Sequence, residues 1–142
     1  MKVKIKKIHS HAIIPEYAKP GDAGMDLTAV SSSYNKETAI KTYCTGLCVE
    51  IPDGYVGLLF PRSSIHKLNL SLANCVGVID SGYRGELIFK FRVLNEGTDH
   101  SYAIGDRIGQ LLILSYPQIE FEEVKELTKT NRGAGGFGST GE

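Results

Sequence analysis

Short stretches in which apolar and polar residues alternate recur along the chain. The first, KVKIKKI, places Val3 and Ile5 on one face and lysines on the other, and in LIFKFRV the residues Leu87, Phe89 and Phe91 share one face. Comparable stretches are TGLCVEI, YVGLLF, LANCVGVI and RIGQLLIL, with turn-forming stretches such as PDG, DSGY and EGTDHSYAIGD between them. Many short strands at fairly regular spacing predict an all-β protein built as an antiparallel sandwich, jelly roll or barrel.

The length and charge of the chain limit the number of domains and the kinds of ligand that we expect. At 142 residues it is long enough for one domain with a modest core. Acidic and basic residues number 16 each, so the whole chain offers no electrostatic footprint for nucleic acid or an anionic membrane. No stretch approaches the length of a membrane-spanning segment, and we therefore expect a soluble, cytoplasmic protein.

The three cysteines, Cys44, Cys48 and Cys75, are odd in number, which argues against a complete disulfide framework and favours a reducing compartment. Cys44 and Cys48 lie four residues apart and can point to one face of a strand. A zinc site is one reading of this spacing, but the histidines are scattered. Buried structural thiols explain the pattern better.

The C-terminal stretch NRGAGGFGSTGE is rich in glycine, so we expect a β domain over residues 1–131 and a flexible arm over residues 132–142. Glycine amides can approach phosphate oxygens closely, Arg132 can form charge-assisted hydrogen bonds, and Ser139 and Thr140 add hydroxyl donors. The ring of Phe137 could lie over a base. Taken alone, the stretch is better explained as a disordered terminus.

The stretch PRSS is the second candidate for chemistry. We expect the only short helix at about residues 64–68, with a serine capping its first amides. Free amides at a helix start form an anion site, which Arg62, Ser63 and Ser64 would reinforce. A plain helix cap explains the same residues equally well.

The stretch GVIDSGYRGE predicts a β-hairpin whose turn holds Asp80, Ser81, Gly82 and Tyr83. At the end of an apolar strand, the Asp80 carboxylate could act as a general base on water. Aspartate is also favoured in hairpin turns simply because its side chain bonds to the backbone.

Two further stretches, GDAGMDL and IGDRIGQ, carry Asp22, Asp26, Asp106, Arg107 and Gln110. Carboxylates near a triphosphate usually serve a magnesium ion, often through its water shell. Singly, each of these residues is more often part of a turn or a surface ion pair.

Together, AGMDL, PRSS, GVIDSGYRGE, GDRIGQL and RGAGGFGSTG resemble, in this order, the five motifs of the trimeric deoxyuridine triphosphatase (dUTPase) family. The resemblance covers residues 23–141. It implies a jelly-roll-like antiparallel β fold and a homotrimer whose active sites combine residues of more than one subunit. It also implies Mg²⁺-dependent hydrolysis of dUTP to dUMP and pyrophosphate, which limits uracil in DNA and supplies dUMP for dTMP synthesis.

The resemblance assigns roles around the nucleoside. Asp80 matches the general base that activates the water attacking the α-phosphorus. Tyr83 matches the tyrosine whose ring packs under the deoxyribose and excludes a 2′-hydroxyl. The strand edge formed by Gly77, Val78 and Ile79, with the Asn74 side chain, matches the edge that pairs with uracil, so cytosine would leave polar groups unpaired.

The resemblance also assigns the phosphate contacts. Arg62, Ser63, Ser64 and Gln110 match positions that hold the phosphates, and Asp26 matches a residue close to the water shell of the magnesium ion. The expected contacts from the arm are Arg132 on the γ-phosphate, Phe137 on uracil, and Gly138, Ser139 and Thr140 as further substrate contacts. Two positions depart from the usual motifs: Gly109 stands where alanine is more frequent, and Ser64 where many members have glycine.

Three alternatives remain at this point. A dCTP deaminase shares the fold and the triphosphate contacts, but typically lacks the glycine-rich arm with its phenylalanine. A nucleotide-sensing module could use the same pocket without turnover. An oligomeric β protein with an unused, disordered tail would lose no activity when the residues after Asn131 are deleted.

Overall fold

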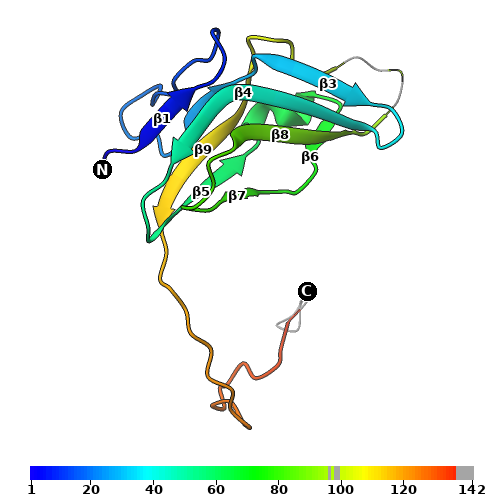
Figure 1. Cartoon of the computed structure of the whole chain (residues 1–142). Helices are drawn as coiled ribbons and strands as arrows, with labels where there is room; N and C mark the ends of the chain where they lie inside the picture. The colour runs from blue at the N-terminus through cyan, green and yellow to red at the C-terminus, as the bar shows by residue number, and fades with distance from the viewer. Residues whose placement is uncertain (96, 98–99, 137–142) are drawn as a thin grey trace.

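The computed structural model describes residues 1–95, 97 and 100–136 of the chain (Figure 1). Within these residues nearly all regular structure is β-strand. The elements are β1 (Lys4–Lys7), β2 (Met25–Thr28), β3 (Ser31–Asn35), β4 (Ile40–Glu50), β5 (Tyr55–Phe60), the 3₁₀ helix η1 (Ser63–Lys67), β6 (Leu70–Leu72), β7 (Gly77–Ile79), β8 (Glu86–Val93) and β9 (Arg107–Ser115).

The strands form two antiparallel sheets. One has the order β1-β4-β8-β6, with β3 also paired to β4, and the other has the order β2-β9-β5-β7. Consecutive strands often lie in different sheets, as in a jelly roll. The prediction of an all-β, jelly-roll-like antiparallel fold is therefore confirmed.

The core lies between the two sheets and is built from the apolar face of each. Phe89 and Phe91 of β8 are buried and their rings stack with centroids 6.0 Å apart, as the alternation in this strand predicts. Leu27, Ile108 and Leu111 of the other sheet are also buried and belong to the same cluster. Removing this apolar surface from water is the main force that holds the sheets together.

Gly109 has a packing reason to be glycine. A Cβ at this position would overlap the ring of Phe89 and would lie 2.9 Å from the carbonyl oxygen of Phe60. The departure from alanine at this position therefore follows from the large side chain that β8 directs at β9.

One predicted strand and one predicted hairpin differ from the structure. The stretch LANCVGVI is not one strand, because β6 ends at Leu72 and β7 begins at Gly77, with a turn in which Cys75 has φ = 59°. The expected hairpin is also wrong: β7 pairs with β5, whereas β8 pairs with β4 and β6. The turn itself exists, since Tyr83 N donates to Asp80 O at 3.0 Å, but it connects the two sheets.

The expected helix begins at Ser63, one residue early, and is a 3₁₀ helix of five residues. No side chain caps it, so the prediction of a serine cap is wrong. Such a short element has little macrodipole, and the helix-start anion site expected here loses its main support.

The cysteines are less buried than expected. Cys44 and Cys48 are half-buried and Cys75 is exposed, all three as free thiols. Among residues 1–95, 97 and 100–136, no group of three or more His, Cys, Asp and Glu side chains could hold a metal ion.

After β9 the chain leaves the two sheets. Residues 116–136 contain no strand or helix and run away from the body of the molecule (Figure 1). Apolar side chains are exposed along this segment, with Phe121 at 93% and Leu127 at 86%. The segment without strands starts before residue 132, and the domain boundary at residue 131 stays a prediction. No helix in the described part of the chain has the length and apolar character needed to cross a membrane.

Candidate functional site

Asp26 lies at the centre of a polar cluster formed by β2, β9 and the residue directly before η1. Its Oδ1 accepts hydrogen bonds from Arg62 Nε at 3.1 Å and Gln110 Nε2 at 3.2 Å, and its Oδ2 accepts one from Arg107 Nη1 at 3.0 Å. The Asp26 side chain is only 15% exposed. We call Asp26, Arg62, Arg107 and Gln110 the Asp26 cluster.

The sheet register explains why these four residues meet. Gln110 of β9 lies opposite Asp26 on one side and opposite Phe60 of β5 on the other. Arg62 follows Phe60 by two residues, directly before η1, so its side chain reaches the same point. The cluster joins segments far apart in the sequence, and each of its charged side chains is oriented by a charge-assisted hydrogen bond.

The Asp26 cluster keeps donors available for an anion. Each arginine carries five N–H groups in a planar fork, and Arg62 and Arg107 each spend one of them on Asp26. A planar fork of this kind suits bidentate contacts with phosphate oxygens. Two guanidinium groups facing one carboxylate leave an excess positive charge.

A pocket of about 350 Å³ opens beside this cluster. It is lined by Arg62, Ser64, Lys67, Leu68, Ser101, Tyr102, Gly105, Asp106 and Arg107. Three of these side chains are cationic and one is anionic, and the Asp106 carboxylate already accepts a hydrogen bond from the Ala103 amide at 2.8 Å. The pocket is therefore suited to an anionic group.

A second group of predicted residues lies along β7 and the turn after it. Asn74 and Asp80 are exposed, and no described residue bonds to the Asp80 carboxylate. Val78 is 61% exposed on β7, which ends its sheet and therefore has one unpaired backbone edge within the described chain. Tyr83 donates its hydroxyl to Glu86 O at 3.0 Å. We call residues 74–83 the β7 group.

Within one chain the two carboxylates, Asp26 and Asp80, lie far apart. Asp26 lies on β2 and Asp80 follows β7, and these strands are the opposite ends of the order β2-β9-β5-β7. With neighbouring strands about 4.8 Å apart, three steps separate the two strands by about 14 Å. A site that uses both carboxylates of one chain would have to span this distance.

The predicted arm is described only in part. Arg132 is exposed and its Nε donates to Gly135 O at 3.1 Å within the same segment. Phe137, Gly138, Ser139 and Thr140 lie outside the described residues.

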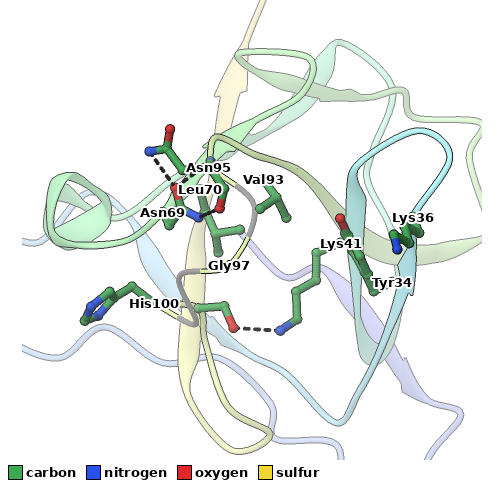
Figure 2. Close-up of a pocket in the computed structure, with 10 residues that line it drawn as sticks. Tyr34, Lys36, Lys41, Asn69, Leu70, Val93, Asn95, Gly97 and His100 are labelled. Carbon is green, nitrogen blue, oxygen red and sulfur yellow. Dashed lines mark hydrogen bonds between the residues drawn. The ribbon is translucent and has the colours of Figure 1, made fainter.

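Figure 2 shows another pocket, of about 500 Å³, beside β3, β4 and the loop after β8. Tyr34, Lys41, Asn69 and His100 contribute to its lining, and Lys41 Nζ donates to Ser101 Oγ at 2.6 Å. None of the site residues predicted from the sequence lines this pocket. Ser101 lines both this pocket and the pocket beside the Asp26 cluster, so the two pockets are neighbours.

Two residues received no role from the sequence: Arg107 of the Asp26 cluster, and Tyr102 of the pocket beside it. Arg107 lies in the GDRIGQL motif, so its position could have suggested a phosphate contact. Tyr102 lies in a loop without a motif or a periodic pattern, and only the folded chain shows that its buried hydroxyl borders the pocket.

Comparison with known proteins places this geometry in a family. The sequence model of the dUTPase family matches residues 10–141. A deoxyuridine 5′-triphosphate nucleotidohydrolase of Helicobacter hepaticus is 43% identical, covering 99% of this chain and 89% of the relative. One of Clostridioides difficile is 40% identical, covering 98% of this chain and 97% of the relative.

Solved structures agree with the sequence relatives. A mutant dUTPase of Staphylococcus bacteriophage 80alpha with dUpNHpp is similar at a TM-score of 0.84, with 27% identity and 99% of each chain covered. A mutant dUTPase from phage phi11 of S. aureus, described with a structural Mg(II) ion, has a TM-score of 0.75 and 27% identity over 89% of this chain and 98% of that one. The chain belongs to the dUTPase family of deoxyuridine 5′-triphosphate nucleotidohydrolases.

Proposed function

We propose that the chain hydrolyses dUTP to dUMP and pyrophosphate by attack of an Asp80-activated water on the α-phosphorus. The observation that carries this assignment is the contrast between two aspartates. Both oxygens of Asp26 accept hydrogen bonds from cationic or amide donors, whereas the Asp80 carboxylate is exposed and has no partner among the described residues. Because its lone pairs are not taken by cationic donors, Asp80 is the better placed of the two to accept a proton from water.

The triphosphate binds at the Asp26 cluster and its pocket. Arg62 and Gln110 are already oriented by Asp26, so less side-chain freedom is lost when they bind phosphate oxygens. Ser63 and Ser64 do not cap η1, which leaves their hydroxyls available to the ligand. Arg107, to which the sequence assigned no role, adds a further cation.

Magnesium fits this site through its water shell. The Asp26 carboxylate has about four lone-pair positions, of which three are used by Arg62, Gln110 and Arg107. The remaining position on Oδ2 can accept a hydrogen bond from a metal-bound water. Mg²⁺ usually keeps several waters and binds substrate phosphates, where it neutralises their charge. The described residues form no direct ligand cage, which agrees with this arrangement.

The β7 group recognises the nucleoside. The unpaired edge of β7 at Gly77, Val78 and Ile79, together with Asn74, presents backbone and side-chain groups that can pair with uracil. Cytosine would leave buried polar groups unpaired, at a cost of about 1–3 kcal/mol each. The exposed Tyr83 ring supplies a surface for the deoxyribose and a steric barrier to a 2′-hydroxyl.

The active enzyme is a homotrimer that combines the two groups from different subunits. The separation of Asp26 and Asp80 at opposite ends of one sheet supports this assembly. The exposed apolar side chains of residues 116–136 support it as well, because contact with a neighbouring subunit would remove them from water. The arm, with Arg132, Phe137, Gly138, Ser139 and Thr140, then closes over bound dUTP.

In the cell, this activity limits uracil in DNA and supplies dUMP for dTMP synthesis. We place the enzyme in the cytoplasm, where its nucleotide substrate is formed.

The test is pyrophosphate release from dUTP in the presence of Mg²⁺, measured beside dCTP, dTTP and UTP. We expect turnover with dUTP and little with the other three nucleotides. Release of ammonia from dCTP would instead support the deaminase, and binding of dUTP without turnover would support a sensing module. A chain shortened after Asn131 should keep its fold and lose turnover, whereas full activity would leave the tail without a role.

A further inference from the structure

Tyr102 is held rigidly beside the phosphate pocket. Its side chain is 8% exposed, and its ring lies 5.9 Å from that of Tyr43 and 5.8 Å from that of Phe91. Tyr43 also donates its hydroxyl to the carbonyl oxygen of Tyr102 at 2.9 Å. Both the ring and the backbone of Tyr102 are thus fixed by the core.

The hydroxyl of this ring has no structural use. Within the described part of the chain it is the buried side-chain polar atom that lacks a hydrogen-bond partner. A buried polar group without a partner is destabilising, and such groups are rare in native proteins. Phenylalanine would fill the same space without this cost, so stability alone does not explain the hydroxyl.

The surroundings of the hydroxyl indicate what it serves. Burial raises the pKa of Tyr102 and the Asp106 carboxylate adds to this, while the positive charge of Arg62 and the Ser64 side chain lower it. These three residues are the polar groups that act on the hydroxyl. A tyrosine hydroxyl is protonated at neutral pH, and the upward shift of its pKa does not change this, so it can act as a donor. Ser64 is half-buried and lines the same pocket as Tyr102 and Arg62.

We propose that Tyr102 is a positioning residue that orients the Ser64 hydroxyl toward a phosphate oxygen of the substrate. The proposal rests on the function assigned above to this pocket. A hydroxyl has one proton and two acceptor positions. When the Tyr102 hydroxyl donates to Ser64 Oγ, the proton of Ser64 is left to point into the pocket, and each hydrogen bond polarises the other. Ligand binding completes a hydrogen bond that is not formed in the present structure.

The test compares Tyr102→Phe, Ser64→Ala and the double variant in steady-state hydrolysis of dUTP. We expect Tyr102→Phe to raise KM about three- to tenfold and to change kcat less than twofold, because the phosphate contact is made in both the bound substrate and the transition state. The double variant should match Ser64→Ala alone, since the tyrosine acts through the serine.

Thermal unfolding separates this role from a structural one. The Tm of Tyr102→Phe should stay unchanged or rise, whereas Tyr43→Phe should lower Tm because it removes a formed hydrogen bond. Tyr34→Phe, on the exposed strand β3, serves as the control that changes neither KM nor Tm.

Two results would overturn the proposal: an unchanged KM for Tyr102→Phe, whether or not kcat and Tm fall, or additive effects in the double variant. If the wild-type chain fails to hydrolyse dUTP, the proposed function is wrong, but the tyrosine is still tested by calorimetry with inorganic tripolyphosphate. Weaker binding of that probe by Tyr102→Phe supports the positioning role, and equal binding contradicts it.

Discussion

Asp26 lies on one edge strand of the four-stranded sheet and Asp80 follows the other edge strand, and the groups around these two carboxylates differ in how far they are organised. In the Asp26 cluster, two arginines and a glutamine converge on one carboxylate that is only 15% exposed. In the β7 group, the Asp80 carboxylate is exposed and has no partner among the described residues. The proposed phosphate-binding side chains are therefore already oriented within one chain. The proposed catalytic carboxylate of Asp80 is not oriented by any described residue.

This difference has a physical reason. Phosphate binding benefits from cations whose positions are fixed beforehand, because less side-chain entropy is lost on binding. A general base needs a free lone pair, and ion pairs with arginine would occupy it. Aspartate thus serves two roles in this protein, and the hydrogen-bond partners of each carboxylate determine its role.

Asp80→Asn should show most clearly that the β7 group acts in catalysis and the Asp26 cluster in binding. We expect Asp80→Asn to lower kcat by about 10² to 10⁴-fold, because the general base is lost. Binding of dUTP and Tm should stay close to the wild-type values, since the side chain is exposed and unpartnered. Asp53→Asn, at another exposed turn aspartate, is the matched control. A near-normal kcat for Asp80→Asn would remove this residue from the role of base.

The same substitution at Asp26 should have the opposite profile. Asp26→Asn removes the negative charge that orients Arg62 and Arg107, and leaves both cations without a counter-charge. We expect the free energy of unfolding to fall by about 1–3 kcal/mol, less than for a fully buried pair because Arg107 is exposed. KM for dUTP should rise as well. Urea unfolding and initial rates measure the two effects, and unchanged stability would mean that the ion pairs are not structural.

Gly109 tests the packing that supports the Asp26 cluster without touching its charges. Gly109→Ala should lower the free energy of unfolding by about 1–2 kcal/mol, because the new Cβ overlaps the Phe89 ring. In the Phe89→Leu background the same change should cost less, since the smaller side chain leaves space, although the close approach to the Phe60 carbonyl oxygen remains. Equal costs in both backgrounds would show that Phe89 does not select glycine.

Ser63 should give the smallest change in stability. Because no side chain caps η1, Ser63→Ala should alter the free energy of unfolding by less than about 0.5 kcal/mol. KM for dUTP should rise, since the hydroxyl is proposed to contact phosphate. A loss of about 1 kcal/mol or more would restore the capping role that the sequence suggested.

Much of the fold follows from local patterns, and the exceptions have identifiable causes. The alternation in β8 predicts which of its residues are buried, because one face of that strand packs on the core. In contrast, β3 consists of SSSYN and is exposed throughout, so no apolar pattern marks it and only its pairing with β4 defines it. The turn after Leu72 places Cys75 in the left-handed region of backbone conformation. Cysteine rarely adopts this conformation, so the residue type does not predict the turn.

The candidate site, like the fold, is predicted from the sequence only in part. The motifs identify Asp26, Arg62 and Gln110, but their shared hydrogen bonds depend on the register of β2 and β5 against β9. The hairpin predicted for the stretch around Asp80 is wrong because sheet membership is decided by pairing partners distant in sequence. The buried hydroxyl of Tyr102 follows from packing between Tyr43 and Phe91 and has no signal in a single sequence.

The central claim is that one active site combines the Asp26 cluster of one subunit with the β7 group of another. The most direct measurement mixes two variants, Asp80→Asn and Arg62→Ala, unfolds them together, refolds the mixture and records dUTP hydrolysis. In randomly mixed trimers about one site in four receives both intact groups, so activity should return to about a quarter of the refolded wild type. Activity no greater than the sum of the two variants alone would contradict the claim.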